Sequence, residues 1–167
     1  MFDKGTMLVH PTYGVCEVVQ VGKIDMKNVK DERVYYTLMP LYDSKSKLFI
    51  PTDSDGAGLR PVMTKENALK LVARLPEMEP ITVQNEKERE KVFKELIRSG
   101  NYEDISRIIK TLYLRKQARL TAGKKAVSLD EKYLFIAREQ LYGELAVSLG
   151  IEKNGVEEYI SKAIDKV

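Results

Sequence analysis

The sequence predicts an α+β chain with two domains, an N-terminal SH3- or Tudor-like small β-barrel followed by an all-α helical domain. Two observations predict this fold class. Residues 1–62 contain short runs of β-branched and aromatic residues separated by turn residues, a pattern typical of strands. After residue 63 the apolar residues recur at helical spacing. We therefore place the barrel at residues 1–62, a helix and a proline-marked linker at 63–80, and a basic helical domain at 81–167.

Five strands are expected in the barrel. They cover residues 6–9, 14–21, 33–39, 47–50 and 59–62, with a polar loop at 23–32 and a turn at 53–56. Neighbouring residues in a strand point to opposite faces, so Tyr35 and Tyr36 cannot both face the core, and one of them is expected to be exposed. Such an aromatic beside an open strand edge either helps to hold another protein by β-augmentation or simply covers the surface.

The helical part begins with Thr64, which can N-cap a helix that Pro76 ends. The clearest linker in the chain follows at residues 76–80. Three or four helices are expected after it. They are placed at 86–98, at 104 to about 120, from the capping-box pair Ser128 and Glu131 to Gly150, and after Asn154.

The positive charge is concentrated in one part of the chain. The whole net charge of +3 lies in residues 81–167, and residues 107–125 contain seven basic side chains and no acidic one. The apolar face of the helix expected there continues into Arg115, Lys116 and Arg119. Clustered cations without acids favour a phosphate-backbone surface, because binding releases counterions. The alternative is a solvated helix end whose basic side chains extend over the core.

The residues offer little for catalysis, metals or cofactors. The single histidine, His10, has no second histidine or cysteine at ligand spacing, and it fits a turn. The single cysteine, Cys16, alternates within a strand and fits a small core residue. One cysteine, no long apolar run and no signal peptide are typical of a cytoplasmic protein. We therefore expect a non-enzymatic chain with no cofactor, no small-molecule substrate and no membrane contact.

Several short motifs occur in both parts of the chain. In the barrel they are Gly5-Thr-Met-Leu-Val-His-Pro11, Tyr13-Gly14-Val15 and Leu48-Phe-Ile-Pro51. In the helical part they are Ser99-Gly100-Asn101, Ile108-Ile-Lys-Thr-Leu-Tyr-Leu-Arg115, Gly123-Lys124-Lys125 and Ala137-Arg-Glu-Gln-Leu-Tyr-Gly-Glu-Leu145. These motifs resemble the CarD/CdnL family of bacterial transcription regulators, whose barrel is similar to the RNA polymerase-interacting domain of transcription-repair coupling factor. The resemblance covers essentially the whole chain.

The resemblance implies two partners. The barrel would pair a sheet edge with the RNA polymerase β subunit, through Tyr35, Lys47, Leu48 and Phe49. The helical domain would lie on promoter double-stranded DNA at the upstream edge of the transcription bubble. Its DNA-facing residues would be Arg89, Lys91, Arg115, Lys116, Arg119, Lys124 and Lys125. The chain would then be associated with the nucleoid through RNA polymerase, and would modulate open-complex formation without catalysis.

One position departs from the family pattern. Members commonly start the first C-terminal helix with an Asn-Trp pair, whose tryptophan wedges into the minor groove and holds the bubble open. An ungapped count places Asn85 and Glu86 there. An apolar wedge unstacks a base step, whereas a carboxylate would be repelled by phosphate, so the resemblance carries over promoter binding but not the wedge. The residues themselves leave two other functions open, a protein-interaction adaptor and an RNA-binding module.

Overall fold

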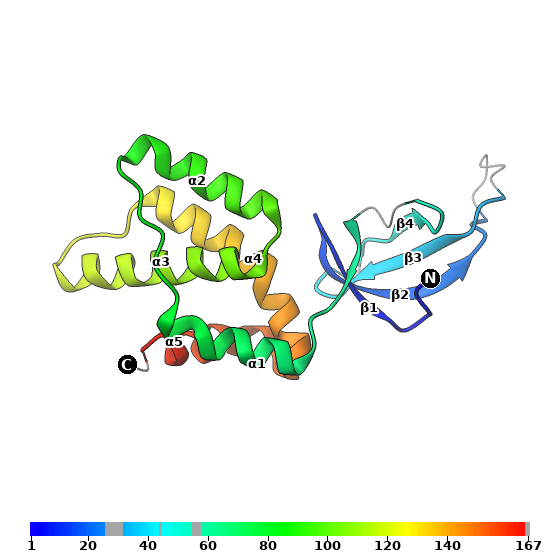
Figure 1. Ribbon diagram of the computed structural model, residues 1–167. Coiled ribbons are helices and arrows are strands. Elements are labelled where there is room, and N and C mark those ends of the chain that lie inside the picture. Colours follow the sequence, from blue (N-terminus) through cyan, green and yellow to red (C-terminus); the bar gives the residue numbers. More distant parts are fainter. Residues whose placement is uncertain (26–31, 44, 55–57, 166–167) are drawn as a thin grey trace. The chain divides into compact units, whose positions relative to one another are not determined.

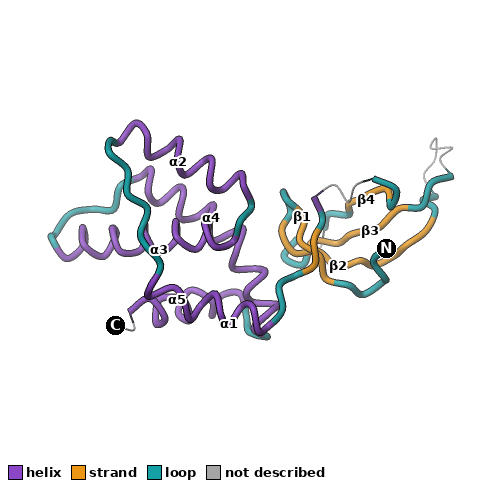
Figure 2. The backbone as a smooth tube through the Cα atoms, viewed as in Figure 1, coloured by secondary structure: helices purple, strands orange, loops and turns teal. Residues whose placement is uncertain are grey.

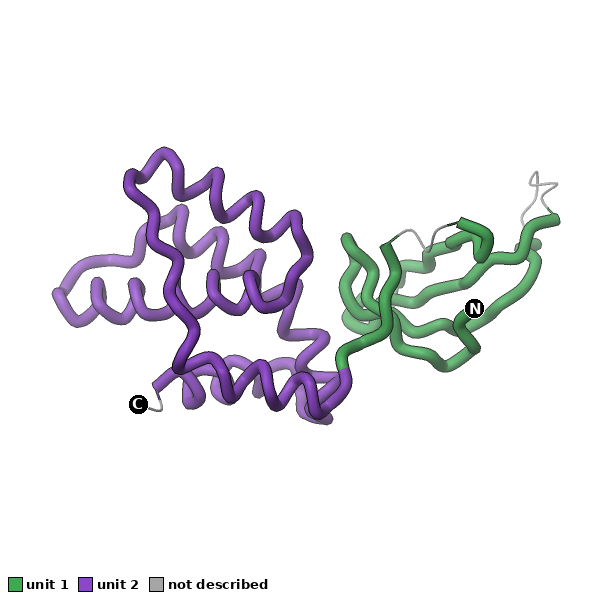
Figure 3. The backbone as a smooth tube through the Cα atoms, in the orientation of Figure 1, with its two compact units in different colours: residues 1–63 green, residues 64–167 purple. Residues whose placement is uncertain are grey.

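The computed structural model describes residues 1–25, 32–43, 45–54 and 58–165. The chain divides into two compact units, residues 1–63 (unit 1) and 64–167 (unit 2) (Figure 3). Strands form the first unit and helices form the second (Figure 2). The predicted α+β organisation is therefore confirmed. The loop expected at 23–32 and the turn expected at 53–56 lie partly outside the described residues.

Unit 1 contains one five-stranded antiparallel sheet (Figure 1). Its strands are β1 (Met7–His10), β2 (Gly14–Gly22), β3 (Tyr35–Pro40), β4 (Leu48–Pro51) and β5 (Arg60–Pro61). All five predicted strands are present, with bounds within two residues of those expected. The order β4-β3-β2-β1-β5 places β4 and β5 at the two edges of the described sheet, so closure into a barrel stays a prediction.

One face of this sheet carries the core of unit 1. The core cluster consists of Leu8, Cys16, Val18, Tyr36 and Leu38. Cys16 is fully buried, as predicted, and burial raises the pKa of its thiol to about 11, so the thiol stays protonated and unreactive. The hydroxyl oxygen of Tyr36 accepts a hydrogen bond from the backbone N–H of Phe2 at 3.0 Å, which satisfies its polar end inside the core.

The expectation that either Tyr35 or Tyr36 would be exposed is wrong. Tyr36 is 4% exposed in the core cluster, and Tyr35 is only 8% exposed. Strand alternation fixes the face that a side chain occupies, but it does not fix what covers that face. Here β3 lies between β2 and β4, and the Arg33 guanidinium lies 5.5 Å from the centroid of the Tyr35 ring. An exposed aromatic of this unit is instead Phe49 on the edge strand.

Unit 2 consists of helices whose ends are set by local sequence. They are α1 (Lys65–Arg74), the short 3₁₀ helix η2 (Leu75–Glu77), α2 (Glu86–Ser99), α3 (Tyr102–Thr121), α4 (Ser128–Leu149) and α5 (Lys153–Asp165). The Thr64 side chain caps α1 by accepting from the Asn67 N–H at 3.1 Å. Gly100 and Gly150 end α2 and α4 in the left-handed region, where glycine is favoured. The predicted N-cap at Thr64 and the predicted helix end at Gly150 are confirmed, and the helix predicted at 86–98 ends one residue later, at Ser99.

The predicted capping box at the start of α4 is wrong. Ser128 is the first residue of the helix, and its N-cap, Val127, has no side-chain cap bond. The nearby carboxylate of Asp130 is instead directed at two arginines on other helices. α4 contacts α1, α2, α3 and α5, which makes it the central helix of unit 2 (Figure 1).

The segment expected to join the domains packs inside unit 2. Lys110 of α3 is 5% exposed, and its Nζ donates to the carbonyls of Pro76 and Met78, both at 2.7 Å. The Thr111 hydroxyl accepts from the Ile81 N–H at 2.8 Å. These contacts fix residues 76–81 along α3. No helix in the described part of the chain is long and apolar enough to cross a membrane.

Candidate nucleic-acid and protein interfaces

An ion-pair network joins α2, α3 and α4 in the region where the DNA-facing residues were predicted. Asn85 caps α2 by accepting from the Glu88 N–H at 3.0 Å, so Glu86 is the first helical residue. Four side chains form the network, which we call the Glu86 cluster: Glu86, Arg89, Arg115 and Asp130. The cluster contains two cations and two anions, so it carries no net charge.

Arg89 is the buried cation of the Glu86 cluster. Its side chain is 6% exposed, and its Nη2 donates to Asp130 Oδ1 at 2.5 Å. Its Nη1 donates to Glu86 Oε1 at 3.2 Å, and its guanidinium lies 5.5 Å from the Phe93 ring centroid. A buried charge persists only when it is paired. Arg89 therefore ties α2 to α4, and we leave it out of the surface set considered for DNA.

Arg115 and Lys116 reach the surface, but each has an acidic partner. Arg115 Nε lies 2.6 Å from Asp130 Oδ2 and its Nη2 lies 3.4 Å from Glu86 Oε1. Lys116 Nζ lies 3.1 Å from Glu131 Oε1. Both basic side chains are 34% exposed. Their charges are thus partly compensated by acids that lie outside the acid-free stretch of the sequence.

Glu86 remains ionised in this environment. Desolvation alone would raise the pKa of its carboxyl, but the guanidinium groups of Arg89 and Arg115 outweigh that effect and hold the pKa below its usual value. The Glu86 side chain is 69% exposed. A permanent negative charge therefore lies at the surface, where the family pattern would place an apolar ring.

Two cations without an acidic partner among the described residues lie in the turn after α3. Gly123 has φ +73°, and the Lys124 N–H donates to the Arg119 carbonyl at 2.8 Å, which reverses the chain. Arg119 Nε donates to the Lys125 carbonyl at 2.8 Å. Lys124 and Lys125 are exposed, and neither has an acidic group within ion-pair distance among the described residues. Lys91 of α2 is likewise exposed and unpaired within the described chain.

The polymerase-facing residues predicted for unit 1 divide into two kinds. Lys47 and Phe49 are exposed, whereas Leu48 is half-buried against the core cluster and Tyr35 is buried. Phe49 pairs in register with Thr37 of β3. Since β4 is an edge strand of the described sheet, its outer backbone groups are available for strand addition, with Phe49 beside them.

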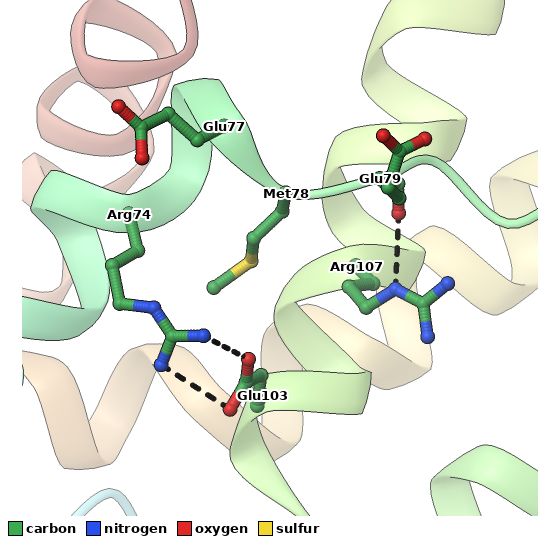
Figure 4. Close-up of a pocket in the computed structure, with 6 residues that line it drawn as sticks. All are labelled: Arg74, Glu77, Met78, Glu79, Glu103 and Arg107. Carbon is green, nitrogen blue, oxygen red and sulfur yellow. Dashed lines mark hydrogen bonds and ion pairs between the residues drawn. The ribbon is translucent and has the colours of Figure 1, made fainter.

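A pocket of unit 2 lies between η2, the residues that follow it and α3. A hollow of about 380 Å³ is lined by Arg74, Glu77, Met78, Glu79, Glu103 and Arg107 (Figure 4). Arg74 is paired with Glu103, and Arg107 Nε donates to the Glu79 carbonyl at 3.0 Å. Two of its charged side chains thus satisfy each other, and a third is held by a backbone carbonyl. Among the described residues, no three histidine, cysteine, aspartate or glutamate side chains could hold a metal ion together.

The partners Asp130 and Glu131 were not found from the sequence. A signal was present, because both acids follow the basic block within six residues of Lys125. A turn between two packed helices brings such residues back alongside the basic face of the first helix. The uninterrupted block of seven cations therefore overstates the positive surface.

Comparison with known families covers both units. Residues 2–63 match the family described as the CarD-like/TRCF RID domain, and residues 70–161 match the CarD C-terminal domain. The two matches follow the order of the two units and cover most of the chain. The resemblance read from the sequence motifs is thereby confirmed. The chain belongs to the CarD family of transcription regulators that interact with RNA polymerase.

Proposed function

We propose that this chain regulates transcription initiation by binding the RNA polymerase β subunit through unit 1 and promoter double-stranded DNA through unit 2. The observation that carries the DNA half is the turn after α3, where Lys124 and Lys125 are exposed and have no acidic partner in the described part of the chain. Cations presented in this way attract the phosphate backbone irrespective of base sequence. Lys91, Arg115, Lys116 and Arg119 extend this surface.

The polymerase half depends on the β4 edge. An exposed edge strand offers a row of unpaired backbone N–H and C=O groups to a strand of another protein. Phe49 adds an exposed apolar side chain and Lys47 a cation at the same edge. Leu48 and Tyr35 support the strand from within the unit rather than from its surface.

Regulation by such a chain needs no catalytic group. A protein that contacts both polymerase and DNA shifts the equilibrium between closed and open promoter complexes by its differential affinity for the two states. A tenfold shift corresponds to about 1.4 kcal/mol, which a few charge and strand contacts can supply. The buried Cys16 and the turn residue His10, whose Nδ1 accepts two backbone N–H bonds, have no part in this mechanism.

The DNA half is tested by the salt dependence of binding of the full chain to a promoter duplex. Replacing both Lys124 and Lys125 with alanine should weaken binding and reduce the slope of log affinity against log salt by about 1.8, since each lost phosphate contact contributes about 0.9. The matched control replaces Lys70 and Lys162 with alanine, an equal charge loss on α1 and α5. Equal slopes for the two double variants would reject the proposed DNA surface. Tighter binding of RNA than of duplex DNA would favour the RNA-binding alternative.

The polymerase half is tested by capture of the isolated β subunit on the immobilised full chain. The variant Phe49→Ser should reduce capture, because it removes the exposed apolar contact at the β4 edge. The control variant Tyr13→Ser changes another exposed aromatic of unit 1, in the turn between β1 and β2, and should have no effect. Undiminished capture by the Phe49 variant would show that β4 is not the docking edge.

A further inference from the structure

Glu86 interacts with Arg115, one of the cations that the proposed function assigns to DNA. Its Oε1 accepts hydrogen bonds from Arg89 Nη1 at 3.2 Å and from Arg115 Nη2 at 3.4 Å. Of these two arginines, Arg115 is the one that reaches the surface, at 34% exposure. A carboxylate and a DNA phosphate are both acceptors for a guanidinium group. Glu86 therefore occupies part of the donor set that a phosphate would use.

The interior of the cluster does not depend on Glu86. Asp130 is 4% exposed and lies closer to both arginines than Glu86 does, at 2.5 Å from Arg89 and 2.6 Å from Arg115. Asp130 thus holds the two guanidinium groups in place, whereas the exposed Glu86 adds a second, outer pair. Exposed ion pairs contribute little to stability. The charge of Glu86 is therefore better explained by its effect on the surface than by its effect on folding.

Glu86 also cancels the net positive charge of the cluster. Without Glu86, the three remaining side chains of the cluster (Arg89, Arg115 and Asp130) would carry a net charge of +1. Arg115 lies on α3, the helix that also carries Arg119, and Arg89 lies near the start of α2. With Glu86 the cluster is neutral, whereas Lys91, Lys124 and Lys125 have no acidic partner among the described residues. Glu86, in the first turn of α2, thus lowers the positive electrostatic potential around Arg115 of α3.

We infer that Glu86 is an internal competitor of the DNA backbone, which keeps Arg115 from phosphate and so limits the affinity of unit 2 for DNA. The inference rests on the proposed function. It gives Glu86 a function of its own at the position where the family pattern has the tryptophan wedge. This member of the family would bind promoter DNA weakly and reversibly unless Glu86 is displaced from Arg115. Displacement is possible because the Glu86 side chain is mostly exposed and free to turn toward solvent.

The test compares the full chain with Glu86→Gln and with the matched control Glu88→Gln. Glu88 lies in the same first turn of α2, is exposed and carries the same charge, but no contact joins its carboxylate to Arg115 in the described structure. Glu86→Gln should tighten binding to a promoter duplex by about three- to tenfold near physiological salt and steepen the salt slope by about one contact, or 0.9. Glu88→Gln should change the affinity less than twofold and leave the slope unchanged.

A further variant identifies the cation that Glu86 releases. In the combined variant Glu86→Gln, Arg115→Gln the gain in affinity should vanish, and thermal unfolding should confirm that the chain is folded. If wild type binds DNA with a salt slope but the Glu86 and Glu88 variants behave alike, the competitor role is overturned and the proposed function stands. If no variant shows salt-dependent binding to duplex DNA, the proposed function fails, and the competitor role fails with it.

Discussion

The variant Asp130→Asn should destabilise unit 2 strongly. Asp130 is 4% exposed and is the carboxylate that lies between Arg89 and Arg115, at 2.5 and 2.6 Å. Asparagine keeps the size of the side chain and one acceptor oxygen but removes the negative charge. The buried Arg89 guanidinium, with 6% of its side chain exposed, would then keep only the outer partner Glu86.

The magnitude follows from the cost of leaving a buried charge without its partner. Breaking a buried pair from one side typically costs about 3–5 kcal/mol. The remaining contact with Glu86 and the retained acceptor oxygen place Asp130→Asn near the lower limit, at about 3 kcal/mol. Loss of a surface pair costs at most about 1 kcal/mol, so the two cases are well separated.

The assay is urea unfolding of the full chain, followed by far-UV circular dichroism, which reports the helices of unit 2. The control variant Glu131→Gln breaks the neighbouring pair with Lys116, whose two side chains are 45% and 34% exposed, and should cost less than about 1 kcal/mol. A loss of stability for Asp130→Asn that is no larger than that of the control would refute the reasoning, because the cluster would then behave as a surface pair.

Three other predictions each concern one residue. Lys110→Met leaves the carbonyls of Pro76 and Met78 without their buried donor and should cost about 2–3 kcal/mol in the same urea assay; a neutral effect would mean that water replaces the ammonium group. Burial lowers the pKa of His10, so the unfolded chain binds its proton more readily, and the stability of unit 1 should fall as the pH drops from about 7.5 through the ordinary histidine pKa of about 6.5. His10→Gln should remove this part of the pH dependence, and an unchanged pH profile would argue against it. Glu86→Trp should lengthen the lifetime of open promoter complexes more than Glu86→Gln does, since only tryptophan adds an apolar wedge; equal lifetimes would place residue 86 away from the bubble.

The features that could be predicted from the sequence are those set by near neighbours. Thr64, Gly100 and Gly150 act within one helical turn, so their caps follow from residue type and spacing alone. The strands were found for the same reason, because β-branched runs between turn residues identify them locally. The helix expected from 104 to about 120 ends at Thr121, so Lys124 and Lys125 lie in the turn after it.

The features that could not be predicted depend on packing between distant segments. Arg89 and Asp130 are 41 residues apart, and nothing local to either residue indicates the other. Burial of Tyr35 depends on Arg33 and on two flanking strands. The family pattern assigns Arg89 to DNA, but in this chain its partner Asp130 holds it inside. Charge counted along the chain thus shows where the basic residues are concentrated, but it cannot show which of these cations are paired with acidic side chains.

The turn after α3 has a consequence for the kinetics of DNA contact. Its shape is fixed by the backbone bond from Lys124 to Arg119 and by the bond from Arg119 Nε to the Lys125 carbonyl, both made before any partner arrives. Little conformational entropy would then be lost on association, and encounter would be guided by charge. With two lysines at its centre that lack an acidic partner among the described residues, such a contact would form and break quickly, which suits the proposed reversible binding of DNA.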